Sequence, residues 1–152
     1  MKGIGVLGNY FKPERLGAPS PFGAYYLNTE SVDSFRQFDV LLIQVPYLLD
    51  RERMRQFIDL IDGLMLTGGF DIPSEFYNEI EVEDVEFTYD RERTHFELQF
   101  LPLVEKKAIP IFAICLGLQM FNVYRGGSLI QDVYQQLGTK INHSISSKDP
   151  TI

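Results

Sequence analysis

Cysteine, histidine and tryptophan are scarce in this sequence. The 152 residues include one cysteine, two histidines and no tryptophan. A single cysteine excludes a disulfide within the chain and suits a reducing compartment. We expect no metal ion and no other cofactor.

Basic residues and long apolar runs are also in short supply. The chain has 14 lysines and arginines and 21 acidic residues, which gives a net charge of −7. Binding a polyanion requires clustered lysine and arginine, so nucleic acid is excluded as the main partner. The most apolar stretch, residues 109–121, contains proline, glycine and glutamine and is too polar to span a bilayer. The apolar run at the N-terminus is too short for a signal peptide. We therefore expect a cytoplasmic protein without a membrane partner.

The order of the apolar segments predicts an α/β fold. The chain is 45% hydrophobic and 23% charged, which suits a single globular domain over residues 1–152. Strands that alternate with helices predict a doubly wound, mostly parallel sheet with helices on both faces. The nearly continuous apolar run at 109–114 predicts a central strand, buried on both faces. The expected strands are 3–7, 39–45, 63–66 and 109–114, and the expected helices are 50–61, capped by Asp50, and 92–107.

The other segments have weaker patterns. Residues 22–38 show a broken helical pattern, and 128–133 resemble a short strand. Pro102 is expected to kink or split the helix over 92–107. Between Glu79 and Glu86 there are five acidic residues and no basic one, which fits an edge hairpin, a lid over a site or a solvated acidic loop.

Cys115 lies where the strand over 109–114 is expected to meet a helix. Ala113 and Gly117 flank it at two residues' distance, and small residues allow the sharp turn of a nucleophile elbow. The start of a helix stabilises a thiolate, and its free N–H groups can hold an oxyanion. The alternative is a small core residue, because free cysteine is among the most buried residue types. The turn at 67–69 also follows a strand, so it should share the sheet edge of Cys115.

Three motifs carry a resemblance to a known family. Residues 113–119, Ala-Ile-Cys-Leu-Gly-Leu-Gln, resemble the nucleophile motif of class I glutamine amidotransferases. Residues 62–73 and 126–132 resemble the γ-glutamyl hydrolase branch of that superfamily, the C26-type peptidases. The motifs occur in the family's order over roughly 62–132, with a fainter match over 22–34. The resemblance implies the flavodoxin-like fold of class I glutamine amidotransferases.

The resemblance also implies a reaction and the residues that perform it. In the family, the cysteine attacks a γ-glutamyl amide carbonyl, and two backbone N–H groups hold the resulting oxyanion. By this resemblance, the nucleophile of this chain is Cys115, and the oxyanion is held by the N–H of Leu116 and the N–H of Gly68 or Gly69. The resemblance also implies that Gln119 binds substrate. From the residues alone, the two glycines are also compatible with an ordinary tight turn, and Gln119 with a solvated helix position.

This sequence departs from the family at the catalytic base. The family uses a Cys-His-Glu triad, with a His-x-Glu step well downstream of the cysteine. The only histidines here are His95, before the cysteine, and His143, in the polar tail, and neither belongs to such a step. We interpret the chain as a family domain truncated at its C-terminus, in which Cys115 is a competent nucleophile but hydrolysis is close to background.

The sequence is compatible with three functions. The first is hydrolysis of a small-molecule γ-glutamyl amide through a thioester, and residues 71–73 followed by Tyr77 resemble the stand-alone hydrolases. The second is a glutaminase subunit that supplies ammonia to a synthase partner. The third is a catalytically silent α/β binding module, which the missing His-x-Glu favours. The sequence leaves open a homo-oligomer, the synthase complex and the amine half of the substrate.

Overall fold

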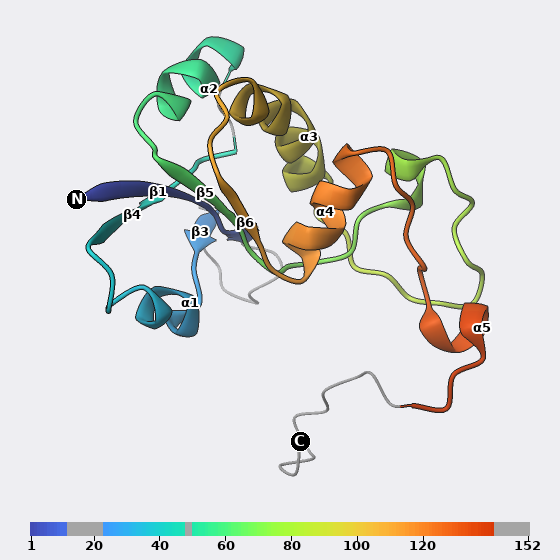
Figure 1. Cartoon of the computed structure of the whole chain (residues 1–152). Helices are drawn as coiled ribbons and strands as arrows, with labels where there is room; N and C mark the ends of the chain where they lie inside the picture. Colours follow the sequence, from blue (N-terminus) through green and yellow to red (C-terminus); the bar gives the residue numbers. More distant parts are fainter. Residues whose placement is uncertain (12–22, 48–49, 142–152) are drawn as a thin grey trace.

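A four-stranded parallel sheet forms the centre of the computed structural model, which describes residues 1–11, 23–47 and 50–141 (Figure 1). Its strands stand in the order β4-β1-β5-β6. In chain order this is second, first, third, fourth, the flavodoxin-like arrangement. The α/β fold and the parallel sheet are therefore confirmed. The strands are β1 (Lys2–Leu7), β4 (Val40–Gln44), β5 (Gly63–Leu66) and β6 (Ile111–Ala113), and β2 (Asn9–Phe11) pairs antiparallel with β3 (Ala24–Tyr26).

Helices lie on both faces of this sheet. Three of them, α2, α3 and α4, cover one face, and α1 lies on the other (Figure 1). Within residues 1–11, 23–47 and 50–141, none of the helices has the length and apolar character needed to cross a membrane. The helices are α1 (Thr29–Ser34), α2 (Arg51–Ile58), α3 (Arg91–Lys106), α4 (Leu116–Tyr124) and α5 (Val133–Leu137), with a 3-10 turn, η2, at Ser74–Tyr77.

The hydrophobic core lies between the sheet and the layer of α2, α3 and α4. Leu7, Leu66, Phe100 and Met120 are at most 1% exposed and belong to one apolar cluster. Burying such a side chain contributes roughly 1.5–3 kcal/mol, so this cluster fixes the helices on the sheet. Asp50 caps α2 as predicted, since its Oδ1 accepts a hydrogen bond of 2.9 Å from the N–H of Arg53.

The position predicted for the apolar run at 109–114 is wrong. Within the described chain, β6 is an edge strand, and Phe112 and Ile114 are 59% and 41% exposed. The strand buried along its whole length is β5, whose four residues are all buried. A run of apolar residues indicates a strand but does not determine which neighbours pair with it. The second strand, β4, is also at an edge, and Leu41 is exposed.

Three smaller predictions also need correction. The broken helical pattern over 22–38 corresponds to β3 followed by α1. Residues 128–133 form no strand; instead, Asp132 begins α5 by accepting a hydrogen bond from Gln135 N–H at 2.7 Å. Pro102 does not split α3, which continues through it with the proline side exposed. The proline-rich segment 12–21, for which the sequence predicts a loop, lies outside the described residues.

The acidic segment is neither a hairpin nor a wall of the Cys115 cavity. It is irregular, and within the described chain one isolated β-bridge, between Asp71 and Tyr89, lies near it. Gln131 tethers it from the segment before α5. The Gln131 side chain accepts a 3.0 Å hydrogen bond from Val82 N–H and donates one of 2.9 Å to the Ile80 carbonyl.

Candidate active site

Cys115 occupies a strained turn between β6 and α4. Its backbone angles are φ 52° and ψ −115°, a region that non-glycine residues rarely adopt. Such strain persists only where the surrounding structure enforces it, and it clusters at functional sites. The cysteine is free and exposed, so the alternative of a buried core residue is wrong.

Gly117 allows the turn to form so tightly. A Cβ atom built there would lie 2.4 Å from the Leu66 carbonyl oxygen and 2.5 Å from the Leu66 Cβ. Only glycine therefore lets the first turn of α4 approach the backbone of β5 this closely. This contact fixes the start of α4, and with it Cys115, at the carboxyl edge of the sheet.

The glycine turn after β5 lies directly beside the thiol. A Cβ built on Gly68 would be 3.6 Å from the Cys115 Cβ and 4.0 Å from its Sγ. In the part of the chain that the structure describes, the N–H groups of Gly68, Gly69 and Leu116 donate no hydrogen bond. The structure thus brings the candidate oxyanion donors to the same edge as Cys115. Their role in stabilising an oxyanion stays a prediction.

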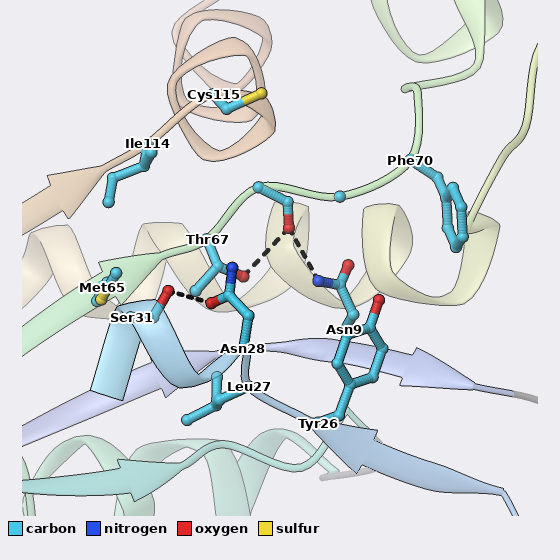
Figure 2. A pocket seen from close by; sticks show the side chains of 12 residues that line it. Asn9, Tyr26, Leu27, Asn28, Ser31, Met65, Thr67, Phe70, Ile114 and Cys115 are labelled. Carbon is cyan, nitrogen blue, oxygen red and sulfur yellow. Dashed lines mark hydrogen bonds between the residues drawn. The ribbon is translucent and has the colours of Figure 1, made fainter. Parts of the chain in front are cut away.

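A cavity of about 480 Å³ opens at this edge (Figure 2). It lies at the carboxyl ends of β1, β5 and β6, where ligands bind in doubly wound sheets. None of the described residues that line it is charged, so its polarity comes from amides, hydroxyls and backbone groups. The lining residues are Asn9, Tyr26, Leu27, Asn28, Ser31, Met65, Thr67, Gly68, Gly69, Phe70, Ile114 and Cys115.

A buried polar network supports the glycine turn from below. Arg93 and Glu97, one turn apart on α3, form an ion pair with a 2.6 Å Nε–Oε1 distance and side chains 1% and 0% exposed. Burial raises the pKa of the Glu97 carboxyl, and the neighbouring Arg93 opposes that rise. This pair was not predicted from the sequence. Its only signal there was an arginine and a glutamate four residues apart on a predicted helix.

Gln119 does not line the Cys115 cavity. It lines a separate small cavity of about 50 Å³, together with Asp71, Tyr89 and Gln131. The structure therefore does not bring Gln119 into the cavity with Cys115. Its substrate-binding role stays a prediction.

The structure supplies no histidine to the cavity from the described residues. His95 is exposed on α3, and its ring packs edge-on against Phe76 with centroids 4.8 Å apart. It does not line the Cys115 cavity. His143 lies outside the described residues. Within the described ranges, no group of histidine, cysteine and acidic side chains could hold a metal ion.

Comparison with known proteins identifies the relatives of this chain. The peptidase C26 family profile matches residues 4–151. YvdE of Lactococcus lactis subsp. lactis, named a glutamine amidotransferase-like protein, is 33% identical over 144 residues, which covers 92% of this chain and 58% of YvdE. RP404 of Rickettsia prowazekii, similarly named, is 34% identical over 131 residues, covering 86% of this chain and 46% of RP404. Protein NtpR of Enterococcus hirae is 37% identical over 102 residues, or 67% and 42% of the two chains. The chain thus spans about half the length of these relatives.

Proposed function

The chain belongs to the peptidase C26 family, within the class I glutamine amidotransferase-like superfamily, and we propose that it cleaves γ-glutamyl amide bonds through Cys115. The observation that carries the proposal is the strained, exposed Cys115 beside Gly68 at the mouth of a cavity. The proposal is supported by a nucleophile that lies beside N–H groups which donate no hydrogen bond within the described residues, because attack on a carbonyl requires both kinds of group.

The proposed reaction has two steps. The Cys115 thiolate attacks the γ-carbonyl carbon, a C–S bond forms, and the carbonyl π electrons move onto oxygen. The tetrahedral intermediate then collapses, the C–N bond breaks, and the amine leaves after taking a proton. Water hydrolyses the resulting thioester to glutamate and restores the thiol. The N–H groups of Leu116 and of Gly68 or Gly69 stabilise the oxyanion in both steps.

The substrate is a small-molecule γ-glutamyl amide, and the reaction needs no cofactor. The uncharged lining of the cavity favours an amide group over a charged one at the reacting end. Because the nucleophile must stay reduced, we place the protein in the cytoplasm. None of the described side chains that line the cavity is a catalytic base. Without general acid–base catalysis, we expect hydrolysis to be slower by ~10²–10⁴-fold than with a base in place.

A glutaminase that supplies ammonia to a synthase partner is the second candidate. The names of the relatives favour it, since YvdE and RP404 are both called glutamine amidotransferase-like. The two functions differ in the amine that leaves: ammonia from glutamine, or a larger amine from a substituted γ-glutamyl amide.

The amine that is released distinguishes the γ-glutamyl hydrolase from the glutaminase. The protein and its Cys115→Ala variant are incubated separately with γ-glutamyl p-nitroanilide and with glutamine, and nitroaniline and ammonia are quantified. A hydrolase releases nitroaniline slowly and only with Cys115 present, and the rate rises when the chain is extended by a downstream His-x-Glu step. A glutaminase releases ammonia from glutamine instead. If removing Cys115 changes neither rate, the silent binding module is correct and the proposal is wrong.

A further inference from the structure

We propose that Arg93 is a positioning residue for the Cys115 site, in that its guanidinium orients the two glycine N–H groups that serve as oxyanion donors. The inference rests on the proposed function. Its basis is the set of contacts that the guanidinium makes beneath the turn. Arg93 Nη2 donates a 2.8 Å hydrogen bond to the Thr67 carbonyl, and Nη1 donates a 3.0 Å bond to the Gly68 carbonyl. One planar fork therefore holds two consecutive carbonyl oxygens.

The Gly68 carbonyl is held from a second direction by Asn9. Asn9 Nδ2 donates to the Gly68 oxygen at 3.0 Å (Figure 2), and Arg93 Nη1 donates to Asn9 Oδ1 at 2.9 Å. Both lone pairs of that carbonyl oxygen therefore have partners. The peptide after Gly68 cannot rotate without breaking contacts to the segment after β1 and to α3 together.

Peptide geometry carries this anchoring to the other side of the chain. In a trans peptide the C=O and the following N–H point in opposite directions. Because the Thr67 carbonyl points at Arg93, the Gly68 N–H points away from it. Because the Gly68 carbonyl also points at Arg93, the Gly69 N–H points away as well. Neither N–H donates a hydrogen bond within the described residues, and Gly68 is the neighbour of Cys115.

Glu97 holds the guanidinium in this orientation. It accepts from Arg93 Nε at 2.6 Å, while its Oε2 has no partner among the described residues. A buried ion pair with an unsatisfied oxygen is a poor source of stability compared with apolar residues of the same volume. The orientation of Arg93 beneath the turn gives the pair a different role. The Nε contact to Glu97 turns both Nη groups toward the carbonyls.

The test separates thiol reactivity from oxyanion binding in the 152-residue protein. Alkylation of Cys115 by iodoacetamide displaces iodide and forms no oxyanion. Addition of Cys115 to the aldehyde 5-oxopentanoate forms a C–S bond and pushes the carbonyl π electrons onto oxygen, which then takes a proton from water. Its affinity is read as protection of Cys115 from alkylation. The alcohol 5-hydroxypentanoate, of the same length, measures binding without the adduct.

Two variants are compared with the unaltered protein. The double variant Arg93→Met with Glu97→Leu removes both charges and keeps an apolar interior, so that it folds. Arg93→Lys keeps the charge opposite Glu97 but loses the fork that spans both carbonyls. Circular dichroism and urea unfolding confirm that each variant is folded before the probes are applied.

The expected result is a selective loss. In the double variant, the affinity for the aldehyde relative to the alcohol should fall about tenfold or more, as expected when an oxyanion donor is misplaced. Alkylation should stay within about twofold, because it depends only on the thiolate. Arg93→Lys should remain folded but should show the same loss of aldehyde affinity. Equal aldehyde affinity in all three proteins, or a parallel fall in both probes, would overturn the inference and make Arg93 purely structural. If the unaltered protein alkylates but binds the aldehyde no better than the alcohol, the proposed function itself fails.

Discussion

Two adjacent glycines in the turn after β5 have different surroundings. A Cβ on Gly68 would meet the Cys115 Cβ at an ordinary 3.6 Å, whereas a Cβ on Gly69 would lie 2.6 Å from Arg93 Nη1 and from Asn9 Oδ1. The atoms beside Gly69 are locked by hydrogen bonds and cannot move aside cheaply.

We predict that alanine affects thiol reactivity at position 68 and folding stability at position 69. Gly68→Ala should change the free energy of unfolding by less than about 1 kcal/mol but should slow alkylation of Cys115, because the methyl group occupies the space beside the thiol. Gly69→Ala should destabilise the fold by roughly 1–3 kcal/mol through overpacking. Urea unfolding and iodoacetamide kinetics measure the two effects. Equal destabilisation by both substitutions would contradict the account.

Tyr47 is a buried residue whose hydroxyl has no hydrogen-bond partner among the described residues. Burial raises the pKa of the Tyr47 phenol far above its ordinary value of 10.0, and the nearby Arg93 opposes this only in part. Above pH 10 the unfolded chain ionises this phenol while the folded chain keeps it protonated. The contribution to stability is therefore complete below the unfolded pKa and is lost as the pH rises above it.

Tyr47→Phe should consequently flatten the fall in stability above pH 10. Near neutral pH it should be neutral or stabilising by about 1 kcal/mol, because an unsatisfied buried hydroxyl is removed. Denaturant unfolding from pH 7 to pH 11 tests both statements. Tyr134→Phe, at an exposed position, is the control. A loss of stability at neutral pH would mean that Tyr47 has a hydrogen-bond partner.

At the scale of elements, the contact between α4 and β5 determines where the nucleophile stands. Gly117→Ala would place a methyl group 2.4 Å from the Leu66 carbonyl, so α4 must move away from β5. We predict destabilisation of roughly 1–3 kcal/mol, together with a changed rate of Cys115 alkylation. Leu118→Ala, on the exposed side of the same helix, should leave both quantities nearly unchanged. Similar results for the two variants would show that the approach of α4 does not set the position of Cys115.

The sequence allowed some of these elements to be predicted and not others, for physical reasons. The elbow at Cys115 was predictable, because the small residues around it reflect a local steric need. The pattern over 128–133 predicts a strand that does not form, and the helix Val133–Leu137 leaves little periodicity because it has only five residues. The role of the Arg93–Glu97 pair was not predictable, because it depends on hydrogen bonds from Arg93 to distant residues. Thr67 and Gly68 lie in the turn after β5, and Asn9 lies in β2. Such contacts join segments far apart in the chain, which local patterns do not report.

At the scale of the whole molecule, the sheet has an open edge at β6 within the described residues. Phe112 and Ile114 are exposed there, although their sequence pattern resembles a buried strand. Pairing along the sheet is set by distant segments, so the apolar pattern predicted the strand but not its position. An exposed apolar edge strand promotes association between chains, and a lysine on it opposes this.

We therefore predict that Phe112→Lys reduces concentration-dependent self-association of the protein without a large loss of stability. Analytical ultracentrifugation over a range of concentrations measures the association, and urea unfolding measures the stability. Leu60 is exposed and lies outside β6, so Leu60→Lys changes the net charge equally and serves as the control. An equal effect of both substitutions would assign the change to net charge and not to the β6 edge.

Acylation by an activated γ-glutamyl ester tests directly whether Cys115 is the nucleophile for a γ-glutamyl carbonyl. The protein is mixed with the p-nitrophenyl γ-ester of glutamate, whose leaving group departs without a proton, so no general acid is needed. Released nitrophenol is followed by absorbance, and the acylated residue is identified by mass spectrometry. We predict a burst of about one nitrophenol per protein, with the γ-glutamyl group in a thioester on Cys115. No burst, or a burst that persists in Cys115→Ala, would contradict the account.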